Sequence, residues 1–153
     1  PKGKKCRVSD ANFSLSSGAR ELTLGAIART SAPGSLTIDP ANPTFTITSA
    51  GAPVSGPVHK VGRTTGWTSG NITNTCVNTG VQGSTIVLLC QTFVSASGVI
   101  VGSGDSGSPA FQITSGNNVR LVGGLWGGNQ SGTQFVYSPI ANIEAELGTL
   151  TTH

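Results

Sequence analysis

The sequence predicts an all-β domain, an antiparallel barrel or sandwich, with a single helix at its C-terminal end. Short runs rich in β-branched and aromatic residues recur along the chain, and Gly, Pro, Asn or Asp bound each of them. Many short strands at even spacing are typical of antiparallel barrels and sandwiches. The runs are ELTLGAIA, SLTID, TFTITS, PVHKVGRT, NITNTCV, STIVLLCQTFV, PAFQI, VRLVGGLW and TQFVYS.

The segment SPIANIEAELGTL near the C-terminus breaks the strand pattern. Ser138 can cap a helix, and Pro139 suits the first helical position because it needs no N–H donor there. Gly148 is a typical residue for ending a helix. Apolar residues recur between them at helical spacing: Ile140, Ile143 and Leu147. We therefore expect a helix over residues 138–147.

Composition narrows the class of protein. The chain has 153 residues, of which 36% are apolar and only 10% are charged, and it contains 22 glycines. Such a chain is long enough for one folded domain rather than a disordered segment. Its net charge is +3, and the N-terminal cluster PKGKKCR suits either a basic arm or a solvated loop. Because no second basic cluster supports the arm, we expect no nucleic-acid partner, and no apolar run is long enough to span a membrane.

Three cysteines bear on the compartment. Cys76 and Cys90 fall in two strand-like runs separated by a Gly-containing turn, so a disulfide across this hairpin is plausible, with two buried free thiols as the alternative. A disulfide would indicate an oxidising, extracellular setting. Cys6 is left over, which suggests a partner elsewhere. The scattered His and Cys residues cannot build a metal site, and we expect no cofactor.

The stretch VGSGDSGSPAF, residues 101–111, raises the question of a catalytic serine at Ser106. It matches the dinucleotide fingerprint G-x-G-x-x-G, but a strand-like run follows it where that fingerprint requires a helix. The nucleophile elbow G-x-S-x-G also fails, because Ser108 occupies its second glycine position.

The segment Gly-Asp-Ser-Gly-Ser-Pro, residues 104–109, closely resembles the nucleophile loop of chymotrypsin-fold serine peptidases, with Ser108 in place of a glycine. VGRTTGWTSG, LVGGLWGG and the C-terminal helix match the family in the same order, so the resemblance to secreted microbial members covers most of the chain. It implies a chymotrypsin/trypsin-like fold: residues 1–52 would end the first barrel and the crossover, and residues 53–153 would form the second barrel with its helix. It also implies that Ser106 is the nucleophile and that the amides of Gly104 and Ser106 form the oxyanion hole.

The resemblance assigns further roles, and one is missing. The triad runs His, Asp, Ser along the chain in this family. Asp10 in CRVSDANFSL resembles the triad Asp better than Asp39 does, but only nine residues precede it and none is histidine. His59, in a strand-like run, is expected to be structural, and His153 is the last residue. We therefore expect the general base, and a partner for Cys6, on an N-terminal segment outside this chain.

Support and recognition roles follow from the same resemblance. The family often holds the aspartate before the nucleophile with an internal arginine, so Arg63 in GRTTGW would pair with Asp105. Leu125, Trp126 and Gly127 would bind an extended peptide as an added strand, although a plain core strand is the alternative. Leu125 replaces a serine that often supports the triad Asp. Residues 91–104 contain no acid, which favours small or apolar substrate side chains over Lys or Arg.

The sequence thus predicts a secreted serine endopeptidase that acts on peptides or proteins, with this chain alone inactive or very weak. The alternative is an inactive homologue that binds peptides without cutting them, because the general base is absent from the chain. A lectin-like sandwich is a third reading, but it does not explain the Gly-Asp-Ser-Gly loop.

Overall fold

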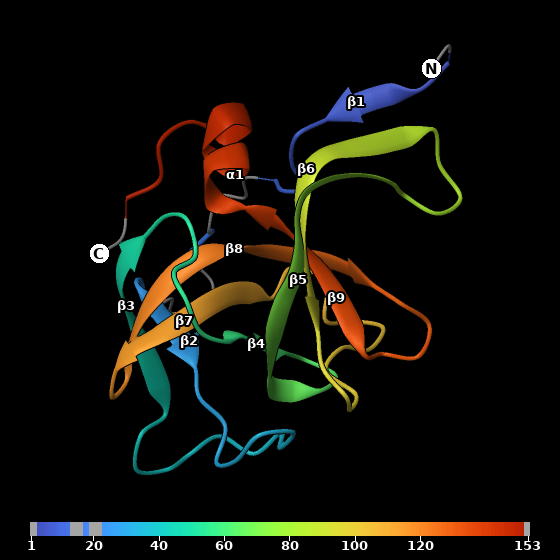
Figure 1. Cartoon of the computed structure of the whole chain (residues 1–153). Helices are drawn as coiled ribbons and strands as arrows, with labels where there is room; N and C mark the ends of the chain where they lie inside the picture. The colour runs from blue at the N-terminus through green and yellow to red at the C-terminus, as the bar shows by residue number, and fades with distance from the viewer. Residues whose placement is uncertain (1–2, 13–16, 19–22, 152–153) are drawn as a thin grey trace.

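A computed structural model describes residues 3–12, 17–18 and 23–151. These residues form short and long strands and one helix (Figure 1). The elements are β1 (Lys5–Arg7), β2 (Ala26–Ala28), β3 (Thr44–Ala50), β4 (Val58–Gly62), β5 (Gly66–Gly80), β6 (Ile86–Ser95), β7 (Pro109–Ser115), β8 (Asn118–Gly128), β9 (Gln134–Pro139) and α1 (Ile140–Leu147). Among the described residues, the structure contains no helix with the length and apolar character needed to cross a membrane.

Six of the strands close into a ring in which every neighbouring pair is antiparallel. The order around the ring is β4, β5, β6, β9, β8, β7 and back to β4. Two further strands extend the sheet, because β3 pairs in parallel with β8 and β2 pairs with β3. The three-residue β1 lies parallel to β6 at the other end. The prediction of an all-β fold with a C-terminal helix is confirmed.

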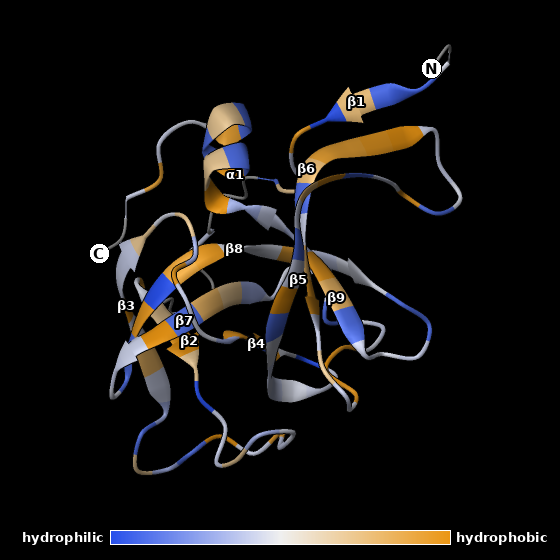
Figure 2. Cartoon of the chain, viewed as in Figure 1, coloured by the Kyte–Doolittle hydropathy of each residue, from blue (hydrophilic) through white to orange (hydrophobic). Residues whose placement is uncertain are grey.

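Two clusters of buried apolar side chains stabilise the sheet. Figure 2 shows apolar stretches along β6 and β8. The larger cluster belongs to the ring and to the loop after β6, and its members are Val58, Val94, Ile100, Val101, Ala110, Val122, Leu125, Phe135 and Tyr137. The smaller joins β2 and β3 to the ring through Ile27, Phe45, Phe111 and Val119. The loop between β6 and β7 leaves the larger cluster at Val101, so the ring fixes one end of that loop.

Two local predictions were wrong. The run SLTID forms only an isolated bridge, Thr30 to Ile38, rather than a strand. The helix begins at Ile140 with Pro139 as its N-cap, and no side chain caps it. Ser138 instead donates its hydroxyl proton to Gln91 Oε1 at 2.8 Å, because that buried acceptor competes with the helix end.

Candidate active site

Residues 102–108 form two consecutive turns between β6 and β7. The N–H of Asp105 donates to the carbonyl of Gly102 at 3.1 Å, and the N–H of Ser108 donates to the carbonyl of Asp105 at 3.0 Å. Gly104 has φ +98° and Gly107 has φ +87°, a region that L-residues with side chains rarely adopt. A Cβ at position 104 would also lie 2.8 Å from Thr64 Oγ1. Glycine is therefore required at position 104 by backbone conformation and by space.

The hydroxyl of Ser106 is exposed on this loop and donates to the carbonyl of Trp126 at 3.2 Å. Hydrogen bonds to β8 fix the loop on either side, from Gly107 N–H to the Leu125 carbonyl at 2.8 Å and from Leu125 N–H to the Ser108 carbonyl at 2.9 Å. In the described part of the chain, the N–H groups of Gly104 and Ser106 donate to no acceptor. The described residues therefore leave the donor protons of both amides unused.

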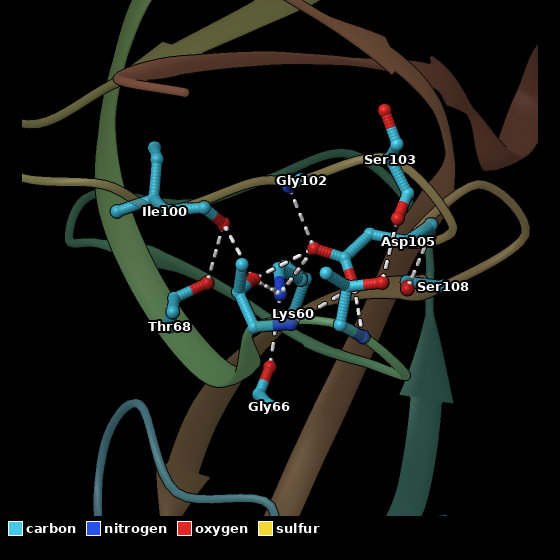
Figure 3. A network of polar contacts seen from close by, with 10 residues as sticks. Lys60, Gly66, Thr68, Ile100, Gly102, Ser103, Asp105 and Ser108 are labelled. Atoms are coloured by element: carbon cyan, nitrogen blue, oxygen red, sulfur yellow. Dashed lines mark hydrogen bonds and ion pairs between the residues drawn. The ribbon is translucent and has the colours of Figure 1, made fainter. Parts of the chain in front are cut away.

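Asp105 is completely buried and organises the turn between β4 and β5 (Figure 3). Its Oδ1 accepts the N–H of Thr64 at 2.8 Å and of Thr65 at 3.2 Å. Its Oδ2 accepts the hydroxyl of Thr65 at 2.6 Å and the N–H of Gly102 at 3.0 Å. Burial alone would raise the pKa of Asp105, but these hydrogen bonds, led by Thr65, and the one from Lys60 outweigh it and lower the pKa to about 2.

The cation that pairs with Asp105 is Lys60 and not Arg63. Lys60 Nζ lies 3.1 Å from Asp105 Oδ2, and both side chains are fully buried. The ammonium also donates to the hydroxyl of Thr65 and to the carbonyl of Gly66. Arg63 is exposed, with its guanidinium beside Gly104, and makes no ion pair among the described residues. The predicted Arg63–Asp105 pair is therefore not formed, because the turn carries Arg63 outward.

Two residues that sequence analysis missed make this arrangement possible. Val58, Lys60 and Gly62 alternate along β4, and the period of two puts them on one face, so the inward lysine could have been found from that alternation. A Cβ on Gly62 would lie 2.3 Å from Asp105 Oδ1. Glycine at position 62 therefore leaves the space that the carboxylate occupies. The extra hydroxyl of Ser108 is buried and bonds to the carbonyl of Asp105.

A groove of about 470 Å³ lies beside Ser106. Every one of the described residues that line it is uncharged. The lining is Gln82, Val101, Gly102, Ser103, Ser106, Leu125, Gly127, Gly128, Asn129, Gln130 and Gly132. Val101 lines the groove and packs closely against Gly128, since a Cβ on Gly128 would lie 2.6 Å from Val101 Cγ1.

Asp10 is exposed, and the segment that carries it is held firmly. Val8 N–H donates to Glu146 Oε1 at 3.0 Å, and the Ser9 hydroxyl donates to Glu146 Oε2 at 2.6 Å. The N–H of Asp10 donates to the hydroxyl of Ser138 at 3.0 Å. The hydrogen bond from Ser9, with smaller contributions from Val8 and others, lowers the pKa of Glu146. Helix α1 and β9 thus anchor residues 8–10.

Asp10 and Trp126 line a second cavity, of about 370 Å³, next to the groove. Gln82, Gly127, Gly128 and Asn129 line both spaces, so the two are neighbours. The Ser106 hydroxyl bonds to the Trp126 carbonyl, and Trp126 lines the same cavity as Asp10. Trp126 therefore contacts both the serine and the cavity that Asp10 lines.

The predicted peptide-binding strand is the end of β8. Both backbone groups of Leu125 already bond to residues 107 and 108 of the loop that carries Ser106, and its side chain is buried in the ring core. The register with β9 shifts between Leu125 and Gly127, which leaves Trp126 in a bulge. A bulge re-aims a side chain relative to its strand. Peptide pairing at Trp126 and Gly127 stays a prediction.

The cysteine prediction is confirmed: Cys76 and Cys90 form a disulfide between β5 and β6. Both lie where the register of this strand pair shifts, and both have positive φ, +54° and +56°. The disulfide closes the hairpin whose tip carries Gln82 into the groove. Cys6 is free and exposed on β1, and whether it pairs with another segment stays a prediction.

His59 is built into the fold. Its Nδ1 accepts the indole N–H of Trp67 at 3.1 Å, and its ring stacks on Phe111. Burial lowers the pKa of His59. His153 lies outside the described residues. Within the described ranges, no three His, Cys, Asp or Glu side chains gather into a possible metal site.

Comparison with solved structures identifies the fold of this chain. No family model and no curated protein sequence matches the chain. Solved structures do match: Thermobifida fusca protease A at TM-score 0.62 and 23% identity, Nocardiopsis protease at 0.57 and 22%, and Cellulomonas bogoriensis chymotrypsin at 0.59 and 22%. The chain has the chymotrypsin fold. A glutamic-acid-specific serine protease, described as using a histidine triad in substrate binding, matches at 0.56 and 20%.

The alignments cover most of this chain but a smaller share of each solved protease. The alignments cover 84%, 88%, 85% and 77% of this chain for the protease A, the Nocardiopsis protease, the chymotrypsin and the glutamic-acid-specific protease. They cover 61%, 60%, 63% and 60% of those solved chains. The chain therefore spans about three fifths of the length of the proteases whose fold it has.

Proposed function

We propose that this chain is the serine-bearing portion of a secreted serine endopeptidase with Ser106 as nucleophile. One observation carries the proposal: an exposed serine hydroxyl lies on a double turn whose Gly104 and Ser106 amides have no acceptor among the described residues. Such amides are suited to stabilise the oxyanion of a tetrahedral intermediate. The fold of bacterial serine proteases and the Cys76–Cys90 disulfide support an extracellular hydrolase.

In the proposed mechanism, a histidine from an N-terminal segment outside this chain takes the proton of Ser106. The serine oxygen attacks the peptide carbonyl, and the Gly104 and Ser106 amides hold the negative oxygen. The histidine then gives the proton to the leaving amine. In the second half, the histidine takes a proton from water, the water oxygen attacks the acyl carbonyl, and the proton passes to Ser106 as its bond to the acyl group breaks. Asp10 orients the histidine and stabilises its charged form. Its anchored segment, residues 8–10, suits that role because a triad carboxylate must be held in place.

The groove beside Ser106 would receive an uncharged substrate side chain. A Lys or Arg side chain would lack a carboxylate partner there, and a Glu side chain would lack a cation, because the described lining residues carry neither. Trp126 and Gly127 would align the peptide as an added strand.

A fluorophosphonate probe tests this proposal in the protein that includes the upstream segment. The probe reacts with activated serines, so we expect labelling of the wild type and none of Ser106→Ala. Ser97→Ala changes an exposed serine that does not line the groove, so it is the control and should be labelled like the wild type. Labelling that persists in Ser106→Ala refutes the assignment.

The second candidate is a peptide-binding homologue without activity. It is favoured by the fact that the one histidine in the described ranges, His59, is engaged by Trp67 and Phe111. Reading the sequence encoded before Pro1 separates the two: a His-Cys segment of the serine-peptidase type supports the enzyme. Its absence, together with peptide binding and no labelling, supports the binding module.

A further inference from the structure

Gln91 on β6 is fully buried, and its side-chain amide makes hydrogen bonds in four directions. Nε2 donates to the carbonyl of Val8 at 2.8 Å and to that of Leu89 at 2.6 Å. Oε1 accepts the indole N–H of Trp126 at 2.9 Å and the hydroxyl of Ser138 at 2.8 Å. A primary amide has two donors and two acceptor lone pairs, so every one of them is used.

The partners of Gln91 fix its orientation. An indole N–H is only ever a donor, so the atom facing Trp126 must be the amide oxygen. A carbonyl is only an acceptor, so the atom facing Val8 must be the nitrogen. The amide therefore cannot flip without leaving both neighbours unpaired, and a buried unpaired polar group is costly.

The Gln91 amide joins the two sides of the candidate site. Ser138 donates to Gln91 and accepts the N–H of Asp10 in turn. The carbonyl of Val8, two residues before Asp10, receives a donor from Gln91 and another from Asn142, each at 2.8 Å. On the other side, Gln91 holds the indole of Trp126, whose carbonyl accepts the Ser106 hydroxyl.

We propose that Gln91 is a positioning residue: through one hydrogen-bond network it holds both the Asp10 segment, residues 8–10, and the side chain of Trp126 in place. Ser138 is its link to Asp10. In the peptidase family that the sequence resembles, a serine at the position of Leu125 often supports the triad carboxylate, and Leu125 cannot supply a hydrogen bond from its side chain. The Gln91–Ser138 pair holds the Asp10 segment through the backbone instead. The inference rests on the proposed function for its catalytic consequence, but the coupling itself is independent of that function.

Two variants separate the link from Gln91 to Asp10 from the link between Gln91 and Trp126. Ser138→Ala removes the link to Asp10 and leaves the Trp126–Gln91 bond. Gln91→Leu removes both. Gln112 provides a matched control, because it is a buried glutamine on β7 whose amide bonds to Val54 and Gly56, away from the groove. If Gln91→Leu does not fold, Ser138→Ala still tests the link to Asp10.

The first readout is nuclear magnetic resonance of the isotope-labelled wild type and variants. Trp67 serves as an internal reference, because its indole bonds to His59. In Gln91→Leu, we expect the Trp126 indole resonance to move and to exchange faster with water while the Trp67 resonance stays. In Ser138→Ala, we expect only the Asp10 amide to exchange faster. Unchanged Trp126 and Asp10 signals in these variants would overturn the proposal.

The second readout is peptide hydrolysis by the protein that includes the upstream segment. We expect kcat to fall by about 10²-fold in Gln91→Leu, because misplacing a catalytic group by about 1 Å has an effect of that order. Ser138→Ala should lower kcat with KM unchanged, and Gln112→Leu should change neither. Equal losses in Gln91→Leu and Gln112→Leu would reduce Gln91 to a purely structural role. A wild type that neither hydrolyses peptides nor takes the probe defeats the proposed function, while the resonance test still decides the coupling.

Discussion

The ammonium nitrogen of Lys60 lies 3.1 Å from Oδ2 of Asp105, and neither side chain has any exposed surface. The lysine comes from β4 and the aspartate from the loop that carries Ser106, so the pair fixes that loop to the ring. Thr65 bonds to both members. A charge buried in this way is tolerable only while its partner is present.

We predict that Lys60→Met lowers the free energy of unfolding by about 3–5 kcal/mol, because it leaves the buried Asp105 carboxylate without its cation. Urea unfolding followed by circular dichroism measures the loss. Arg63→Met is the matched control: Arg63 is exposed and unpaired with Asp105, so its change should stay within about 0.5 kcal/mol. The reverse ranking of the two variants would restore Arg63 as the partner.

Low pH should weaken the ion pair between Lys60 and Asp105 and so lower the free energy of unfolding. The pKa of Asp105 is about 2 in the folded chain against an ordinary value of 3.8, so its stabilisation is complete above about pH 4 and is lost as the pH falls through 2. The shift corresponds to roughly 2 kcal/mol. Urea unfolding of the wild type and of Asp105→Asn between pH 2 and 6 tests it, since the variant should lack this part of the pH dependence. Parallel curves for the two proteins would contradict the assignment.

Local pattern predicted most of the strands, because period-two runs bounded by turn residues are local signals. The loop that carries Ser106 was instead predicted from the resemblance of residues 104–109 to a peptidase family, and the same resemblance placed the wrong cation beside Asp105. The alternation of Val58, Lys60 and Gly62 contains the correct answer, but a fully buried lysine is rare, and Arg63 in the following turn was the expected choice. The outcome depends on the turn at residues 63–65, which Asp105 itself shapes from 40 residues away.

Other misses have the same non-local origin. Ser138 has the local chemistry of a helix cap, yet the buried amide of Gln91 takes its proton. The strand β1 exists only because three residues near the N-terminus lie along β6, some 80 positions later. The run SLTID alternates correctly but meets a neighbour only at one bridge. For Ser138 and for β1, the deciding partner is distant in sequence.

Gly62→Ala should destabilise the fold by about 1–3 kcal/mol, because the added methyl carbon would lie 2.3 Å from Asp105 Oδ1 and 2.6 Å from its Cγ. Thermal unfolding measures the effect. Gly80→Ala is the control, since Gly80 also lies in a strand and has nothing within 4 Å of the new methyl group. Equal melting temperatures for the two variants would show that the space beside Asp105 is not tightly filled.

The Cys76–Cys90 disulfide closes a segment with a sequence separation of 14. Loop-closure entropy predicts that the double variant Cys76→Ala/Cys90→Ala loses about 3 kcal/mol of stability. Urea unfolding gives the value, and Cys6→Ala should match the wild type because Cys6 is free and exposed. A double variant as stable as the wild type would mean that strand pairing alone holds the hairpin.

The last prediction concerns the groove and rests on the proposed peptidase activity. Val101 is 5% exposed, lines the groove beside Ser106 and packs closely against Gly128. The wild type should therefore favour peptides with a small uncharged side chain before the cleaved bond, and Val101→Ala should raise kcat/KM for leucine or phenylalanine there by about 10-fold or more, the range expected for a hydrophobic-pocket contact of one or two methyl groups. Val99→Ala is the control, because Val99 is 63% exposed and does not line the groove. A peptide series differing only at this side chain measures the ratios, and identical preferences in the wild type and Val101→Ala would place the side-chain site elsewhere.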